Sequence, residues 1–182
     1  MKRPVITSAA VAGTLGVAFL VFHALRATTE KAATPPRVAD QCPERLRTFD
    51  TLDFEVFSNQ KWDRLAESHA NDITVTWPDG HETNGLTRHI EDLKGIFVST
   101  PDMKVIAHPI KICSGDWTAV TGVMTGTFSR PMPTPGGQTI PPTGKALRLT
   151  MATIAHWKGG TMDHEWLFWD NHEFMRQIGL VQ

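Results

Sequence analysis

Apolar residues recur at helical spacing in two parts of this chain. The first covers residues 43–59, where Pro43 suits the first turn of a helix, and a second short helix is expected around Trp62 and Leu65. The other covers residues 86–99. The pattern therefore predicts that the helices of the folded part come mainly before its strands.

Alternating apolar and polar residues, many of them β-branched, dominate the rest of the folded part. The predicted strands are residues 73–77, 104–112, 118–128, 146–157 and 163–169. A loop rich in Pro and Gly covers residues 130–144, and residues 171–178 are expected to form a short final turn or helix. Helices followed by a run of antiparallel strands are typical of an α+β fold, in which helices pack on one face of a curved sheet. The concave face of such a sheet leaves room for a ligand pocket.

A long apolar run lies at the N-terminus. Lys2 and Arg3 precede apolar residues that extend from Val5 to Leu25. About 20 apolar residues span a bilayer, and a positive flank before an apolar run also begins a secretory signal. An uncleaved anchor and a removed signal both remain open, beside the alternative of a buried core helix.

These patterns divide the chain into three parts. Residues 1–27 are predicted to be a signal peptide or an N-terminal membrane anchor, residues 28–40 a linker, and residues 41–182 the domain. The positive-inside rule places the domain on the far side of the membrane. We therefore expect an exported protein that is periplasmic, secreted, or anchored facing away from the cytoplasm, with the N-terminal segment as its only membrane contact.

The chain has a formal net charge of -1, and its charge pattern excludes nucleic acid as a partner. The domain carries no basic run or basic-aromatic stripe, and nucleic-acid binding needs such a footprint. Six Trp and nine Phe instead indicate a large aromatic core or pocket, while the absence of Tyr removes that residue type as an acid or base.

The chain has two cysteines, Cys42 and Cys113. An oxidising compartment permits a disulfide between them, and two unpaired buried thiols are the alternative. No Cys/His spacing suggests structural zinc, and no HxH or HxxxH pair stands on one plausible element. The sequence therefore predicts no metal site.

Several separated motifs of the domain resemble one known family. Gly126-Thr127-Phe128 and, after the loop, the stretch IPPTGK at residues 140–145 form one part of the pattern. EWLFWD at residues 165–170, followed by QIGL at residues 177–180, forms the closing part, and Trp77-Pro78-Asp79-Gly80 with Gly85 stands at the turn of the first strand. Over about residues 44–182 the chain resembles SnoaL-like polyketide cyclases and their ester-cyclase relatives.

The resemblance implies both a fold and a chemistry. It implies a cone-shaped α+β barrel of the nuclear-transport-factor-like type, a curved antiparallel sheet with N-terminal helices packed over it that encloses a pocket. The characterised polyketide cyclases close a ring by intramolecular aldol condensation without metal or cofactor, using a pocket Asp as acid and base. That Asp matches Asp170 here.

The period of the last strand supports a role for Asp170. Alternation puts His164, Trp166, Phe168 and Asp170 on one face. A carboxylate among aromatic rings loses solvation, which raises its pKa and suits proton transfer next to a carbonyl. The alternative is that Asp170 caps the backbone at the end of the strand.

Other side chains are expected around the same pocket. Trp77 and Trp166 are predicted to line it beside Phe168, and His108 and His164 are candidate site histidines. His81 and His89 flank the turn after the first strand and are expected near the pocket mouth.

Two functions follow from this pocket. One is a cofactor-independent cyclase, isomerase or lyase that acts on a small hydrophobic carbonyl compound. The other is a module that binds an apolar ligand without turnover. A structural or partner-binding domain at a membrane is a third hypothesis, and analogy also leads us to expect a homodimer.

Overall fold

The computed structural model of the chain describes residues 40–182, and all structural statements below concern that part. The predicted signal or anchor, and all of the predicted linker except Asp40, lie outside the described residues. Within residues 40–182 no helix has the length and hydropathy that crossing a membrane requires.

Helices and strands follow one another in the predicted order. They are α1 (Cys42–Thr51), the π-helical turn η1 (Leu52–Phe57), the 3₁₀ helix η2 (Trp62–Glu67), β1 (His69–Thr76), β2 (Glu82–Asn84), α2 (Leu86–Ser99), β3 (Lys104–Ala107), β4 (Lys111–Ser114), β5 (Trp117–Thr127), β6 (Met132–Pro133), β7 (Thr139–Ile140), β8 (Ala146–Lys158), β9 (Thr161–Trp169) and α3 (Asn171–Gln177).

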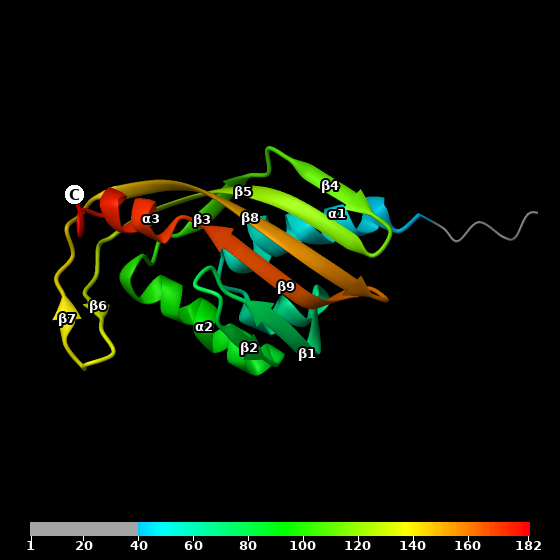
Figure 1. Cartoon of the computed structure of the whole chain (residues 1–182), viewed down its shortest axis with the longest axis horizontal. Coiled ribbons are helices and arrows are strands. Elements are labelled where there is room, and N and C mark those ends of the chain that lie inside the picture. The colour runs from blue at the N-terminus through cyan, green and yellow to red at the C-terminus, as the bar shows by residue number, and fades with distance from the viewer. Residues whose placement is uncertain (1–39) are drawn as a thin grey trace, which may run out of the picture. The chain divides into compact units, whose positions relative to one another are not determined.

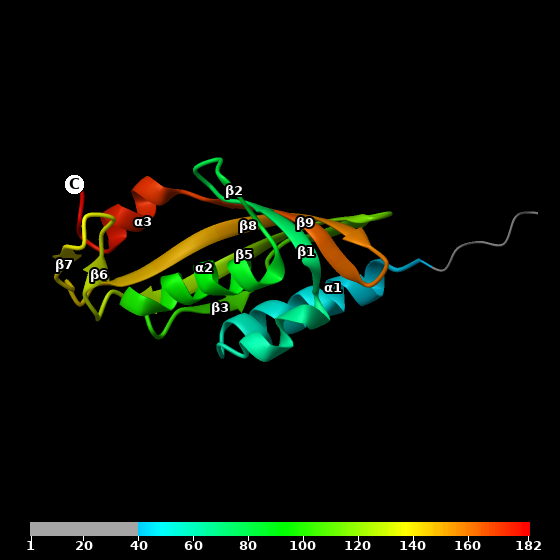
Figure 2. The same cartoon turned by 90° about the horizontal axis from the view of Figure 1, so that it is seen from below.

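A curved seven-stranded sheet forms the centre of the domain. Its strand order is β2-β1-β9-β8-β5-β3. The seventh strand, β4, pairs with a different part of β5 from the part that pairs with β3. The helices α1 and α2 lie on one face of it (Figures 1 and 2). This confirms the predicted α+β class with helices over a curved sheet, but the sheet stays open, because β2 and β3 lie at opposite ends of the strand order. The cone-shaped barrel that the resemblance implies is therefore a curved sheet that does not close.

Two details of the sheet also differ from the expectation. The strand β1 runs parallel to β9, whereas all other neighbours in the sheet are antiparallel. The single strand expected at residues 104–112 is divided into β3 and β4 at His108 and Pro109. Proline lacks the N–H that continuous hydrogen bonding to a neighbouring strand needs, so the strand is interrupted there. The chain then pairs with another part of β5 as β4.

The core lies between the helices and the inner face of the sheet. Alternate residues of β8 are buried, from Leu147 to Trp157, as a strand with one covered face requires. From the helices, Phe49 of α1 and Val56 of η1 are almost completely buried against it. A Cβ atom at Gly126 of β5 would lie 2.5 Å from the Thr100 side chain, so this strand reaches the end of α2 only with glycine.

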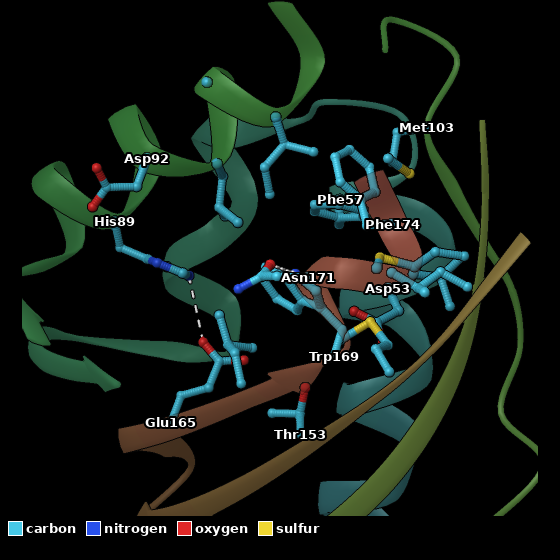
Figure 3. A pocket seen from close by; sticks show the side chains of 18 of the residues that line it. Asp53, Phe57, His89, Asp92, Met103, Thr153, Glu165, Trp169, Asn171 and Phe174 are labelled. Atoms are coloured by element: carbon cyan, nitrogen blue, oxygen red, sulfur yellow. Dashed lines mark hydrogen bonds and ion pairs between the residues drawn. The ribbon is translucent and has the colours of Figure 1, made fainter. Parts of the chain in front are cut away.

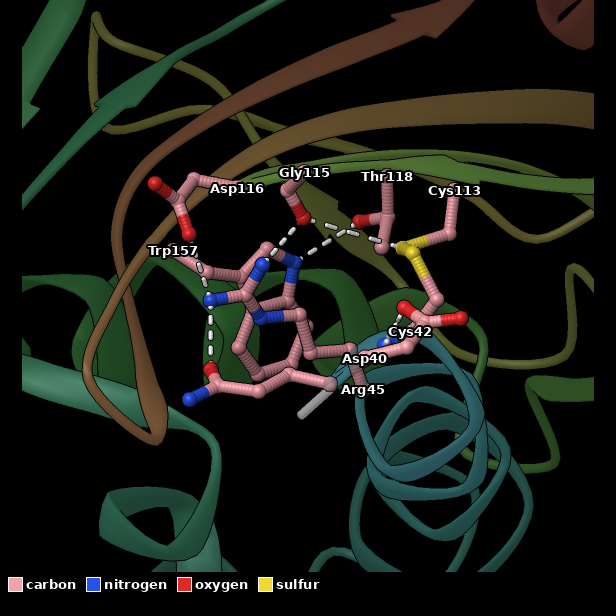
Figure 4. The surroundings of a disulfide bond; sticks show 9 residues. Asp40, Cys42, Arg45, Cys113, Gly115, Asp116, Thr118 and Trp157 are labelled. Carbon is pink, nitrogen blue, oxygen red and sulfur yellow. Dashed lines mark hydrogen bonds and ion pairs between the residues drawn. A yellow bond between two sulfur atoms is a disulfide. The ribbon is translucent and has the colours of Figure 1, made fainter. Parts of the chain in front are cut away.

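A disulfide and a buried arginine fasten α1 to the β4–β5 hairpin. Cys42 and Cys113 are bonded, with their Cα atoms 5.5 Å apart. The guanidinium of Arg45 donates to the carboxylate of Asp116 at 2.7 Å and to the carbonyl oxygen of Gly115 (Figure 4). Arg45 is only 5% exposed, and its charge is paired with the carboxylate of Asp116, which is exposed.

Candidate functional site

A cavity of about 390 Å³ lies between the inner face of the sheet and the elements α2 and η1. This volume is within the range of pockets for small organic molecules. Its walls are largely apolar and rich in methionine, and they include Phe57, Leu93, Met103, Met124, Met151 and Leu167. The cavity therefore favours an apolar ligand with few polar groups.

One cluster of buried polar side chains in the cavity wall joins three elements. His69 begins β1, His89 lies in the first turn of α2, and Glu165 lies in the middle of β9. Nε2 of His69 is 3.6 Å from Oε2 of Glu165, and Nε2 of His89 is 3.5 Å from the same oxygen. Figure 3 shows Glu165 and His89 facing each other across one side of the cavity. Each of the three residues brings one nitrogen or oxygen ligand atom to within 4.8 Å of the others.

Burial and mutual contact set the charges of this cluster. Burial lowers the pKa of His89 to about 4, which leaves its imidazole neutral at pH 7. Burial alone would raise the pKa of Glu165, but the imidazoles of His69 and His89 on balance lower it. The cluster thus presents a carboxylate beside a neutral imidazole to an otherwise apolar space.

A second buried carboxyl group, Asp53, lies in the cavity wall. It is placed by η1, where the N–H of Ser58 donates to the carbonyl oxygen of Asp53. Such π-helical turns occur frequently at functional sites. Burial raises the pKa of Asp53, although the contact with His108 opposes this shift.

A chain of hydrogen bonds connects Asp53 with the protein surface. His108 Nε2 is 2.7 Å from Asp53, and its Nδ1 is 2.8 Å from Asp50. Lys111 in turn donates to Asp50 at 2.7 Å. Burial alone would lower the pKa of His108, but the hydrogen bonds to Asp53 and Asp50 on balance raise it. The two neighbouring carboxyl groups therefore favour the protonated form of His108.

Comparison with known proteins identifies the family of this fold. The family of SnoaL-like polyketide cyclases matches residues 49–178, which is most of the domain. The chain belongs to the SnoaL-like polyketide cyclase family. No curated protein matches the sequence.

Solved structures agree with this assignment at the level of the fold. IdmH of Streptomyces antibioticus, named as a candidate polyketide cyclase, is 23% identical, with a TM-score of 0.64 over 75% of this chain and 99% of that chain. A SnoaL-like candidate polyketide cyclase of Jannaschia sp. CCS1 is 18% identical, with a TM-score of 0.68 over 80% of this chain and 98% of that chain. A SnoaL-like fold of this kind supports small-molecule binding or a cyclase-type function.

In this SnoaL-like domain the last strand presents the opposite face to the one expected. Glu165, Leu167 and Trp169 line the cavity, whereas Phe168 is 48% exposed on the other face. Trp166 stacks there on His164, with ring centroids 3.5 Å apart. Alternation defines two faces but not which of them is covered, and here the buried imidazoles make the face with Glu165 the inner one. The expectation that His164, Trp166 and Phe168 line the pocket is thereby corrected.

Asp170 also lies outside the cavity that the SnoaL-like fold encloses. It is exposed and forms the N-cap of α3, where its carboxylate accepts the backbone N–H of Glu173 at 2.9 Å. The placement corresponds to the alternative of a strand-end cap. A residue at the end of β9 meets the orphan N–H groups of the helix that follows, and Asp is a preferred residue for that contact.

Two substitutions test the cap. Asp170→Asn is expected to leave the free energy of unfolding nearly unchanged, because Asn caps helices as well as Asp, whereas Asp170→Ala should lower it by about 1 kcal/mol. Urea unfolding of both variants measures this difference. Equal losses of stability in the two variants would contradict the capping role.

The other expected pocket residues lie behind the cavity wall. Trp77 packs against Trp169 and His89 at centroid distances of 6.3 and 5.9 Å, and its Nε1 donates to Thr83. His108 does not line the cavity and instead holds Asp53. Both residues therefore position groups that face the cavity. Of the two histidines expected at the pocket mouth, only His89 reaches the cavity, and His81 is exposed.

Sequence reasoning missed Asp53, His69 and Glu165, although two of them left a signal. Asp53 interrupts the apolar face of the first helix, between Phe49 and Val56. Glu165 shares a strand face with two large apolar residues. An ionisable side chain on such a face is rarely buried unless it is paired with another polar group. His69 precedes the predicted first strand and left no such signal.

Proposed function

We propose that this SnoaL-like domain binds a small hydrophobic carbonyl compound in its cavity and catalyses acid/base chemistry of the cyclase or isomerase type. Asp53 is the acid/base group in this proposal. The observation that carries it is a buried carboxyl group, paired with a histidine, in the wall of an otherwise apolar cavity.

The surroundings of Asp53 suit proton transfer. The proposed step moves a proton from the carbon next to the carbonyl group to the carboxylate of Asp53, which then returns it to another atom of the same molecule. Burial, which raises the pKa of this group, makes it a stronger base than an exposed Asp. The ring of His108 fixes the orientation of the carboxylate, and an N–H of the neutral imidazole of His89, which also lines the cavity, can donate to the carbonyl oxygen.

A single isosteric substitution tests the role of Asp53. A ligand is first found by thermal shift among small hydrophobic carbonyl compounds, and turnover is then followed with the compound that binds. Asp53→Asn should keep binding and lose about 10²–10⁴-fold in turnover, which is the usual contribution of a general acid or base. Asp92→Asn is the matched control, since Asp92 also lines the cavity but pairs with Arg88. Undiminished turnover by Asp53→Asn would refute the proposal.

A binding module without turnover is the second candidate, because the apolar cavity supports it equally. The same experiments separate the two functions. A ligand that raises the melting temperature of the wild-type protein, but is never converted, favours the binding module.

We also propose that the domain is exported by residues 1–27, either after cleavage or as an anchored protein. Lys2 and Arg3 before a long apolar run support export, and so does the bond between Cys42 and Cys113, since disulfides persist mainly in oxidising compartments. A reporter fused after residue 40 that is active only in the cytoplasm would contradict this.

We also propose that the domain forms a homodimer, as analogy with the family leads us to expect. Trp117, Ile154 and Phe168 are large apolar side chains that are exposed in the described part of the chain. Sedimentation of the protein at the mass of a single chain would exclude the dimer.

A further inference from the structure

The cluster of His69, His89 and Glu165 has a feature that the proposed acid/base role of Asp53 does not explain. All three side chains are buried, with exposures of 2%, 2% and 5%. Nε2 of His69 and Oε2 of Glu165 have no hydrogen-bond partner among the described residues, and neither has Nδ1 of His89. Buried polar atoms are rarely left without a partner, because each carries a desolvation penalty.

The hydrogen bonds of His69 indicate which of its nitrogens faces the cluster as an acceptor. Its Nδ1 lies 2.8 Å from Oγ of Ser68 and 3.3 Å from the carbonyl oxygen of Leu65. Because a carbonyl oxygen only accepts, this arrangement favours the tautomer that carries its proton on Nδ1. In this tautomer Nε2 carries a lone pair, and at 3.6 Å from Oε2 of Glu165 it makes no hydrogen bond to the carboxylate.

We propose that His69, His89 and Glu165 bind one divalent transition-metal ion of the Zn²⁺ type in the wall of the cavity. A cation at this point would contact Nε2 of His69 and Oε2 of Glu165, the two buried atoms that lack a hydrogen-bond partner. Two imidazole nitrogens and one carboxylate oxygen form a common ligand set of catalytic zinc sites, whereas Mg²⁺ and Ca²⁺ prefer oxygen ligands only.

The geometry of the three side chains agrees with this ligand set. Zinc binds His nitrogen and carboxylate oxygen at about 2.0–2.2 Å, so ligand atoms around a tetrahedral ion lie roughly 3.3 Å apart. The separations of 3.6 Å from His69 to Glu165 and 3.5 Å from His89 to Glu165 need little adjustment to reach that value. The bond from Nδ1 of His69 to Ser68 also fixes the ring, as outer partners of zinc-binding histidines commonly do.

The position of the cluster gives the ion access to a ligand. All three side chains line the cavity, and three protein ligands leave a fourth position of a tetrahedral ion open. A carbonyl oxygen of a bound compound can occupy that position, where the metal would act as a Lewis acid. The site goes beyond the proposed acid/base role of Asp53 and does not depend on it, because ion binding needs only the three ligands.

Direct binding of Zn²⁺ tests the proposal. The full-length protein is treated with chelator, dialysed, and titrated with zinc chloride by calorimetry. We expect one zinc per chain and a higher melting temperature when zinc is added, since an ion that binds only the folded state stabilises it. Glu165→Gln and His89→Gln should each weaken binding by about 100-fold or more, beyond the 10–100-fold typical of changes outside the ligand set.

His156→Gln is the matched control. His156 pairs with Asp163 at 2.6 Å, which resembles the His–Glu contacts of the cluster, but it does not line the cavity. It should bind zinc as the wild-type protein does. If the control loses binding while Glu165→Gln keeps it, surface histidines bind the zinc and the proposal is wrong.

A crystal of the wild-type protein soaked in zinc keeps the proposal testable if the cavity variants do not fold. An anomalous difference peak at the zinc absorption edge is expected between the three side chains. No stoichiometric binding and no peak would overturn the site and leave only a buried His–Glu pair. Bound zinc with full turnover by Asp53→Asn would refute the proposed role of Asp53 alone, whereas absence of zinc binding together with loss of turnover by that variant would refute the metal site alone.

Discussion

Replacing His108 with leucine is expected to lower the free energy of unfolding by about 3–5 kcal/mol, since breaking a buried ion pair leaves its partner charged and uncompensated. His108 lies between Asp50 and Asp53, with only 2% of its side chain exposed. Leucine fills much of the same space but offers nothing to the carboxylate of Asp53, which is buried in the cavity wall. Urea unfolding below pH 6.5, where the contribution of His108 is fully present, measures the loss.

His156→Leu is the matched control for this experiment. His156 also pairs with an aspartate, Asp163, but the two side chains are 33% and 30% exposed. A pair that water reaches contributes about 1 kcal/mol or less. Similar losses from both substitutions would show that Asp53 does not depend on the charge of His108.

The loss at His108 should depend on pH in a definite direction. The raised pKa of His108 means that its contribution is fully present below the ordinary His value of 6.5 and disappears as the pH rises through the raised value. In His108→Leu this dependence is absent. Lowering the pH toward the raised pKa of Asp53 protonates that carboxylate and removes the uncompensated charge. The difference between wild type and variant should therefore be greatest in mildly acidic solution below pH 6.5. It should decrease as the pH rises through the raised pKa of His108, and decrease again at the lower pH at which Asp53 is protonated.

The helices were predictable from the sequence because their signals are local. Apolar spacing alone gave α2 its bounds at Leu86 and Ser99, and Gly85 stands before it with a φ of 90° that favours glycine. The long strands β5, β8 and β9 were found to within a few residues for the same reason. The three-residue strand β2 carries too little pattern to be seen.

The faces and pairings of the strands were not predictable in the same way. Period two separates His164, Trp166 and Phe168 from Glu165 and Leu167, but it does not tell which set is covered. The parallel pairing of β1 with β9 joins residues that are distant in sequence, and no local sequence pattern at either strand indicates it. The inner face was therefore chosen as the one that includes Asp170, and this choice was wrong.

The candidate site is hidden from sequence reasoning because no single element contains it. A search for metal ligands by HxH or HxxxH spacing assumes one helix or strand. Here His69, His89 and Glu165 come from β1, α2 and β9, and Asp53 comes from η1. Only the fold brings the four groups to one cavity. Asp170 was favoured instead because it lies in a motif of the family, although motif residues at strand ends also serve as caps.

Removing the disulfide by the double substitution Cys42→Ser/Cys113→Ser is expected to lower the free energy of unfolding by about 4 kcal/mol. The two cysteines are 71 residues apart, and a cross-link that closes so long a loop restricts the unfolded chain strongly. Urea unfolding of the oxidised protein and the double variant measures the difference. The reduced wild-type protein is the control, and it should unfold together with the variant.

The same substitution should also loosen one wall of the cavity. The disulfide ties the first residue of α1 to β4, and α1 continues directly into η1, which carries Asp53. Arg45 still joins α1 to Gly115 and Asp116 without the disulfide, so the domain should stay folded. We therefore expect faster hydrogen exchange in α1 and η1 of the double variant at pH 7, with β5 and β8 unchanged. Uniformly faster exchange in every element would mean that the disulfide stabilises the whole domain and has no particular effect on the wall that holds Asp53.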